Sequence, residues 1–362
     1  MGPATVPQPS RSRAWGWLDE RLGIGGLRYP VPAHANSLAY TLGGITLASF
    51  VLLVITGIYL AQFYDPTAAQ AHASVAYISN TAFAGELIRS VHYWLATAFT
   101  ITLILHMVRT FATASFKAPR EFIWITGVLL FLLAAGLLFS GTVLKQDQEA
   151  VEALGHNNEI ADLFGFAGFW FSADFTNNVS IVTRLYVAHV SILPVMVAVV
   201  LAVHMLLIKR HRISPLPFGS ADEVQERERS ERLVTFTSHL RHIGLWSLVL
   251  LGAALLLAGL APAALGPIGV EGIEITKPPW YFLWLYPWED WIGLKALYII
   301  PGILVLGLLA IPFLDRSRER DPRRRRLWIA LAAVVLVAWV GLTIYGHVTV
   351  PVSHTSKMEH GG

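Results

Sequence analysis

The sequence predicts an all-α integral membrane protein with seven transmembrane helices, a four-helix bundle followed by a three-helix module. Composition is the first observation: of 362 residues, 54% are hydrophobic and 14% charged, whereas soluble domains are roughly 25% charged. The second observation is a set of apolar stretches close to the roughly 20 residues that cross a bilayer as a helix. They lie at about 38–63, 90–111, 122–144, 183–208, 244–265, 296–314 and 327–348.

The connections between these stretches alternate in charge. On the side of the N-terminus they carry Arg109, Lys117, Arg120, Lys209, Arg210, Arg212, Arg316, Arg318, Arg320 and the basic run 323–326. On the other side they carry Asp147, Glu149, Glu152, Glu159, Asp162, Asp174, Glu271, Glu274, Glu289 and Asp290. Because basic connections stay in the cytoplasm, we expect a cytoplasmic N-terminus and a location in the inner (plasma) membrane of a bacterium. The net charge of +3 follows from this topology, so nucleic-acid binding is not expected.

Two polar segments divide the chain. Residues 1–30 lack the apolar core of a signal peptide and are predicted to form a tail and a short interfacial helix. A polar interval at about 209–243 reads as a linker between a domain at 31–215 and a domain at 216–362. The chain has no Cys, which excludes disulfides, thiolate metal sites and thioether-attached cofactors.

Four histidines lie inside predicted spans. His92 and His106 are fourteen residues apart in the second span, and His189 and His204 are fifteen apart in the fourth. At 1.5 Å and 100° per residue, each helix presents two imidazoles on one face, roughly 21 Å apart along the axis in the second span and about 22 Å in the fourth. Since both spans run in the same direction, His92 is level with His189 and His106 with His204. Each pair can hold a haem iron from both sides, which suits electron transfer because no iron position stays open.

The alternatives are a hydrogen bond between helices and a proton or ion pathway. Such pathways usually recruit Asp or Glu within the membrane, and these spans lack them. Glycines support the haem interpretation, because Gly43 and Gly57 in the first span, and Gly127 and Gly141 in the third, are also fourteen apart. Glycines often mean close helix packing, but this shared period favours space for porphyrin edges against the backbone.

Three arginines lie close to these histidines in sequence: Arg89, Arg109 and Arg184. Each is near a helix end, where a guanidinium can bind a haem propionate. Anchoring on the basic side explains Arg109 equally well. The remaining histidines, which include His156 and His354, are expected to be interfacial.

Four segments together resemble a known family: "PAHANSLAYTLGGITLASF", "LIRSVHYWLATAFTITLILHMVRTF", "FKAPREFIWITGVLL" and "TRLYVAHVSILP". They closely resemble cytochrome b of the quinol-oxidising bc and b6f complexes. The fifteen-residue step from His189 to His204 resembles the b6 branch, and the last three spans resemble subunit IV of the b6f complex, fused here into one chain. The resemblance covers about residues 15–350.

The resemblance implies a di-haem bundle with two non-covalent b-type haems, an outer one on His92 and His189 and an inner one on His106 and His204. It implies a quinol:cytochrome c oxidoreductase subunit that is active only within a complex. Quinol is oxidised at an outer site, electrons cross the membrane through the haems, and quinone is reduced at an inner site, so protons are translocated in a Q-cycle. The implied partners are a Rieske iron–sulfur protein, a cytochrome c-type subunit and a second copy of the chain.

The quinol site departs from the family pattern. The family carries Pro-Glu-Trp-Tyr, whereas "ITKPPWYFLWLY" has Pro279 in place of the proton-accepting Glu. Similar variants belong to relatives that use menaquinol, which makes menaquinone a candidate substrate. Asp147, Glu274, Glu289 and Asp290 are candidate proton acceptors, and Tyr286 is a candidate hydrogen-bond partner of the quinone. The predicted quinol site is Pro278, Pro279, Trp280, Tyr281, Tyr286, Asp147 and Glu289.

A further departure concerns a third haem. The b6 branch attaches one through a Cys in the first span, where this chain has Thr41. A covalent third haem is therefore not expected, while a non-covalent one stays open. Two other functions also stay open: a di-haem membrane anchor of a quinone-linked dehydrogenase or reductase without bifurcation, and a haem-binding scaffold without redox turnover.

Overall fold

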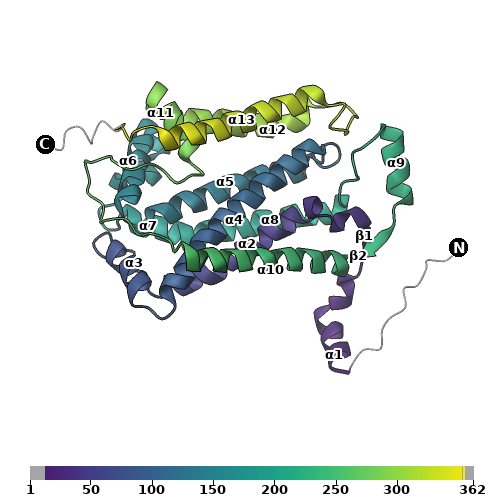
Figure 1. The fold of residues 1–362 in the computed structure, drawn as a ribbon, viewed down its shortest axis with the longest axis horizontal. Helices are drawn as coiled ribbons and strands as arrows, with labels where there is room; N and C mark the ends of the chain where they lie inside the picture. Colours follow the sequence, from purple (N-terminus) through teal and green to yellow (C-terminus); the bar gives the residue numbers. More distant parts are fainter. Residues whose placement is uncertain (1–12, 353, 355–362) are drawn as a thin grey trace.

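The computed structural model describes residues 13–352 and 354, and its dominant feature is a bundle of long apolar helices (Figure 1). Within these described residues, seven helices are long and apolar enough to cross a membrane, as the sequence predicts. They are α2 (Leu38–Ala61), α4 (Gly85–Ala112), α5 (Glu121–Val143), the continuous α7–η6–α8 (Ile181–His211), α10 (Phe236–Leu260), α12 (Ala296–Leu314) and α13 (Arg326–Val348).

The short elements gather at the two ends of the bundle (Figure 1). We call the end with α3 (Ala71–Asn80), α6 (Gln148–Leu163) and α11 (Tyr286–Ile292) the acidic end, and the end with β1 (Pro30–Pro32), α9 (Ala221–Ser230) and β2 (Leu233–Thr235) the basic end. The other short elements are α1 (Arg13–Leu22), η1 (Ile24–Leu27), η2 (Ala33–Asn36), η3 (Gly165–Ala167), η4 (Phe169–Phe171), η5 (Ala173–Phe175) and η7 (Leu283–Leu285).

The polar interval at 209–243 is an ordered connection. Helix α9 begins with a capping box, in which the Ser220 hydroxyl accepts from the Glu223 amide and the Glu223 carboxylate accepts from the Ser220 amide. Strand β2 pairs antiparallel with β1, with Val234 opposite Val31. Helix α10 starts at Phe236, earlier than the predicted 244, because Thr235 caps it by accepting from the Ser238 amide.

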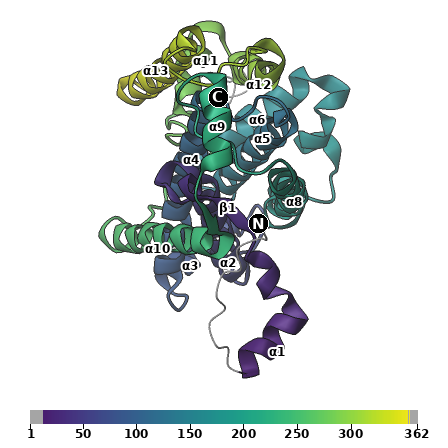
Figure 2. The same ribbon diagram turned by 90° about the vertical axis from the view of Figure 1, so that its right-hand side faces the viewer.

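The helices pack in pairs. Helix α2 packs most extensively against α4, and α5 against α8, whereas contact between these two pairs, through α4 and α5, is far sparser. Helix α10 packs against α4 and α2, α12 against α5, and α13 against η7 and α11. The last three spans therefore flank the four-helix bundle, with α10 on one face and α12 and α13 on the opposite one (Figures 1 and 2).

A buried ion cluster joins two connections at the basic end. Asp315 accepts from Lys117 Nζ at 2.8 Å and pairs with Arg325 Nη2 at 2.8 Å. Burial alone would raise the pKa of Asp315, but the hydrogen bonds from Lys117, Ser317 and Arg325 outweigh it and hold that pKa below its ordinary value. The cluster ties the α4–α5 connection to the α12–α13 connection.

Candidate functional site

The four intramembrane histidines come from two helical segments. His92 and His106 lie on α4, His189 on η6 and His204 on α8. His92 is close enough to His189, and His106 to His204, for each pair to interact electrostatically. The structure therefore brings together the residues that the spacing puts level with each other.

The fifteen-residue step in the fourth span has a structural cause. His189 lies in η6 (Ala188–Ile192), a π-helical turn between α7 (Ile181–Val187) and α8 (Leu193–His211). A π turn takes up one extra residue. Pro194, at the start of α8, has no N–H to donate to the carbonyl of Val190, which favours the wider turn. Fifteen residues here therefore cover the same helical rotation as the fourteen between His92 and His106.

Each of the four predicted glycines lies against one of these imidazoles. An added Cβ would be 2.9 Å from Cε1 of His106 at Gly43 and 3.0 Å from Cε1 of His189 at Gly141. The corresponding distances are 3.4 Å at Gly57, to His92, and 3.6 Å at Gly127, to His204. The missing side chains thus make room first for the imidazole rings. Space for porphyrin edges at these glycines stays a prediction.

Three hydroxyl side chains that the sequence reasoning missed hold these rings. Each stands directly before a glycine and lies within hydrogen-bond distance of a histidine Nδ1: Thr56 to His92 at 2.8 Å, Thr126 to His204 at 2.8 Å and Ser140 to His189 at 2.9 Å. The sequence signal that could have identified these hydroxyls is a Thr-Gly or Ser-Gly pair, which occurs at three of the four glycine positions.

These hydroxyls fix the imidazole tautomer. Each also donates to a main-chain carbonyl four residues earlier, on Leu52, Phe122 and Gly136, at 2.7–2.9 Å. Because a hydroxyl has one proton, it must accept from the imidazole, so Nδ1 carries the hydrogen and Nε2 keeps its lone pair. A free Nε2 is the donor that an axial iron ligand needs.

The fourth position differs. Leu42 precedes Gly43, and the Nδ1 of His106 is buried with no hydrogen-bond partner among the described residues. The histidine pair at the basic end is therefore asymmetric, since His204 has its hydroxyl and His106 does not.

The three arginines bond to carbonyl oxygens around the bundle ends. Arg89 donates to Ala263, Arg109 to Ala39 at 3.0 Å, and Arg184 to Trp170 at 3.0 Å and Ser172 at 2.6 Å. Within the part of the chain that the structure describes, the buried Nε of Arg89 and of Arg184 has no hydrogen-bond partner. Their assignment to propionates stays a prediction.

The predicted quinol loop lies beside the His189 end of α5. Tyr281 Oη is 3.0 Å from Oγ1 of Thr142, the residue after Gly141. The Trp280 ring packs against Tyr281 and against Trp339, with centroids 5.7 and 6.3 Å apart. The Pro279 carbonyl accepts from the Leu283 amide at 3.0 Å, which turns the chain into η7.

The Asp147 carboxylate binds main-chain amides. Its carboxylate caps α6 by accepting from the Ala150 amide at 3.1 Å, and it accepts from the Gly266 amide at 3.2 Å. Burial raises the pKa of Tyr281, and the acid whose charge raises it further is Glu149. Burial raises the pKa of Glu149 above its ordinary value, although its ion pair with Lys145 opposes this.

A sequence model of the family described as cytochrome b/b6 (petB) matches residues 27–212, just over half of the chain. This chain belongs to the cytochrome b/b6 family. A second family model, the C-terminal part of cytochrome b/b6 (petD), matches residues 272–358. Membership makes the chain a b-type haem-binding, transmembrane protein of electron transport.

Known relatives agree with this assignment. The chain is 37% identical over 208 residues to cytochrome b6 of Heliobacterium mobile and 36% identical to that of Heliobacterium modesticaldum, in each case over 55% of this chain and 98% of the relative. A solved structure titled "Hyperthermophilic respiratory Complex III" superposes with a TM-score of 0.79 at 24% identity, over 95% of this chain and 93% of that one. That likeness shows the cytochrome b fold.

The other candidate proton acceptors, Glu274, Glu289 and Asp290, belong to a separate cluster in this cytochrome b. Glu289 Oε1 lies 3.2 Å from His156 Nε2, and Asp290 Oδ1 lies 2.6 Å from His354 Nε2. Tyr286 Oη accepts from the Val352 amide at 2.7 Å. The side chains of His156 and His354 are largely buried at the acidic end and paired with carboxylates. Their interfacial position stays a prediction.

The electrostatics of this cluster follow from burial and pairing. Burial would lower the pKa of His156, but pairing with the Glu274 and Glu289 carboxylates raises it to about 11. Burial would raise the pKa of Glu274, but His156 and His354 hold it well below its ordinary value. The pKa of His354 is raised by Glu274 and Asp290 against the effect of burial.

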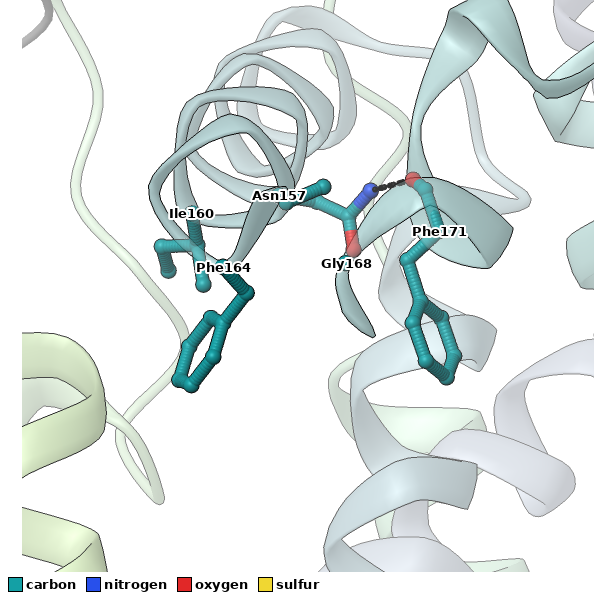
Figure 3. A pocket seen from close by; sticks show the side chains of 6 residues that line it. Asn157, Ile160, Phe164, Gly168 and Phe171 are labelled. Carbon is teal, nitrogen blue, oxygen red and sulfur yellow. Dashed lines mark hydrogen bonds between the residues drawn. The ribbon is translucent and has the colours of Figure 1, made fainter. Parts of the chain in front are cut away.

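A cavity of about 280 Å³ lies at the acidic end between α6 and η4, lined by Asn157, Ile160, Ala161, Phe164, Gly168 and Phe171. Asn157 Nδ2 donates to the Phe171 carbonyl at 2.8 Å, and the Phe164 and Phe171 rings flank the opening (Figure 3). Its lining includes neither an intramembrane histidine nor Tyr281. It is apart from both parts of the candidate site.

Proposed function

We propose that this chain is the cytochrome b subunit of a quinol:cytochrome c oxidoreductase of the complex III type. The observation that carries the proposal is the pair of histidine couples, one toward each end of the bundle, with the Tyr281 loop bonded beside the His189 couple. The solved relative with the same fold is titled a respiratory Complex III. The acidic end faces the outside of a bacterial inner membrane and the basic end the cytoplasm, following the distribution of Lys and Arg.

In this proposal His92 and His189 hold one haem through Nε2, and His106 and His204 hold the other. Bound there, a haem supplies a one-electron carrier without an open iron position. The protein's own part is orientation: Thr56, Ser140 and Thr126 keep the Nδ1 hydrogen on three of the rings. Arg89, Arg109 and Arg184 bind the propionates through their charged guanidinium groups.

Quinol oxidation takes place at the loop with Pro278, Pro279, Trp280 and Tyr281. Pro279 has no group that accepts a proton, so another base is required. Glu149 fits this role, because it interacts with Tyr281 and its pKa is raised toward the working range of a general base. Lys145 holds its carboxylate in place. Asp147 and Glu289 are already bonded to other parts of the protein.

The proposed partners are a Rieske iron–sulfur protein, a cytochrome c-type subunit and a second copy of this chain. Haems held by His92 and His189 and by His106 and His204 would supply the electron path from the acidic end to the basic end. Quinone would be reduced at the basic end, and protons would be released at the acidic end. Menaquinol is the proposed substrate, because the loop has Pro279 where a glutamate is usual. The proposed domains remain 31–215 for the two haems and 216–362 for the quinol loop.

Redox-titrated visible spectra of the purified protein test this function. Two low-spin haems with distinct midpoint potentials are expected, and one or none would contradict the proposal. In the assembled complex, one quinol should deliver one electron to cytochrome c and one to a b haem. If both electrons reach the same acceptor, the protein is a di-haem anchor without bifurcation.

A further inference from the structure

Two histidines and three carboxylates outside the haem and quinol sites converge at the acidic end. His156 comes from α6, Glu274 from the loop before the Tyr281 segment, Glu289 and Asp290 from α11, and His354 from the C-terminal segment. The side chains of His156, Glu274, Glu289 and His354 are between 2% and 15% exposed. Burying three acids beside two imidazoles requires compensating positive charge.

The distances from Glu274 to the facing atoms of His156 and His354 are close to those in a tetrahedral metal site. His156 Nε2 lies 3.3 Å from Glu274 Oε1 and 3.2 Å from Glu289 Oε1. His354 Nδ1 lies 3.1 Å from Glu274 Oε1 and 4.0 Å from Glu289 Oε2. Ligand atoms about 2.0–2.1 Å from a tetrahedral Zn²⁺ are about 3.3 Å from each other. One ligand atom each of His156, Glu274 and His354 lie within 4.8 Å of one another.

The outward nitrogen of each ring is already bonded to an acceptor. His156 Nδ1 donates to the Glu152 carbonyl at 2.8 Å, and His354 Nε2 donates to Asp290 at 2.6 Å. This leaves His156 Nε2 and His354 Nδ1 to face the carboxylates. The second arrangement is the carboxylate–histidine pairing that orients histidine ligands in metal proteins.

Neighbouring contacts hold the histidines in place. The Tyr286 ring packs edge-on against His354 at 5.0 Å between centroids, and Tyr286 Oη holds the Val352 amide. The Glu152 carboxylate bonds to the amides of Ile275 and Thr276, which fixes the loop next to Glu274. The side chains of this cluster are therefore held in place without a bound ion.

We propose that His156 Nε2, His354 Nδ1, Glu274 and Glu289 bind one Zn²⁺ ion, with Asp290 and the Glu152 carbonyl orienting the two rings. Two imidazole nitrogens and two carboxylates form a donor set that suits Zn²⁺. The ion would cross-link α6, the loop before Lys277, α11 and the C-terminal segment. The competing occupant is a proton on each facing ring nitrogen, since two imidazolium charges equal the charge of one Zn²⁺.

Titration of the full-length, untagged protein with zinc chloride tests the proposal. After stripping with a chelator and dialysis, the wild type should bind one tight Zn²⁺ per chain. H156N and H354N should weaken that binding at least 100-fold, and D290N, which removes only the negative charge of an orienting acceptor, about 10–100-fold. H347N is the matched control, because His347 is an exposed histidine near the same end, and it should bind as the wild type does.

The X-ray absorption spectrum of the zinc-loaded wild type should contain two imidazole nitrogens and two carboxylate oxygens at about 2.0–2.2 Å. This measurement decides the matter even if a histidine variant fails to assemble, which its haem spectrum would reveal. Wild-type binding equal to that of H156N, or a shell of oxygens alone, would overturn the zinc assignment and leave a protonated histidine–carboxylate cluster. The haem and quinol proposals are unaffected by either outcome.

Discussion

A single hydroxyl orients each of three proposed haem ligands, and the basic-end pair has one ligand with a hydroxyl and one without. Thr126 accepts from His204, while Leu42 occupies the equivalent place next to His106. A bonded Nδ1–H makes an imidazole more basic and stabilises the oxidised iron. Two single substitutions therefore act on the same haem in opposite directions.

We expect T126V to raise and L42T to lower the midpoint potential of the inner haem. A hydrogen bond of about 1 kcal/mol corresponds to about 40 mV for a one-electron couple. Redox titration of the visible bands measures both shifts, with the outer haem as internal reference. Equal shifts of the two haems, or shifts of the same sign in both variants, would disprove this role of the hydroxyls.

The glycines at this haem differ in clearance. A Cβ at Gly43 would lie 2.9 Å from the His106 ring, whereas one at Gly127 would lie 3.6 Å from His204. G43A should displace the imidazole and lower the inner haem content severalfold, because the ring is packed against helix backbone. G127A should retain the inner haem. Haem per chain, measured from pyridine haemochrome spectra, distinguishes the two, and equal loss would indicate helix packing as the common cause.

Glu149 offers a test of the proton acceptor. E149Q cannot take a proton, so quinol oxidation should slow about 100-fold, at the low end for general-base catalysis. Since the base must be ionised, wild-type activity should rise with pH through the raised pKa of Glu149, and E149Q should lose that rise. Steady-state rates across pH measure both effects. E271Q, at an exposed loop position, is the control, and an unchanged pH profile in E149Q would remove Glu149 from the mechanism.

At the level of elements, the π turn η6 controls the register of His189. P194A restores the missing N–H and should favour a regular α-helix, which rotates His189 away from His92 by about one residue, or 100°. The outer haem should be lost, while P301A, a proline inside α12, should leave both haems.

Deleting Ile192 in the P194A background tests the same idea in reverse. A regular helix with one residue fewer has the fourteen-residue step of the second span, so the outer haem should return. Haem content and the optical spectrum provide the measurement. Continued absence of the outer haem in the deletion variant would mean that the turn serves another purpose.

The features that depend only on the pattern of residues within one helix could be predicted from the sequence. The seven spans, the four histidines and the four glycines follow from hydropathy and helical period, which act within one helix. The β1–β2 pairing and the early start of α10 were missed, because they depend on a partner strand and on a cap. The cluster of His156, Glu274, Glu289 and His354 was beyond reach, since no periodicity links residues about 200 positions apart.

For the whole molecule, the Asp315 cluster joins the two halves of the chain at the basic end. D315N leaves Lys117 and Arg325 buried without their counter-charge, and breaking such a pair costs about 3 kcal/mol. Thermal unfolding, followed by the loss of haem absorbance, should occur at lower temperature. E319Q, on a more exposed pair with Arg324, is the matched control and should change little.

The Asp315 cluster should make the stability of the folded protein depend on pH. The pKa of Asp315 is lowered in the folded protein, so its stabilisation is present above the ordinary carboxylate pKa near 4 and is lost as the pH falls through the folded value. The wild type should therefore lose thermal stability in acid more steeply than D315N. Parallel curves for the two proteins would contradict this account.

The sparse contact between the α2–α4 pair and the α5–α8 pair bears on biogenesis. A bundle whose halves barely touch has little interior of its own, so a newly inserted chain depends on its cofactors for cohesion. Haem supply would then act as a checkpoint of assembly, because chains that bind haem would close into a stable subunit and chains without it would stay open to membrane proteases. Cofactor delivery, more than synthesis, would set how much of this cytochrome b accumulates.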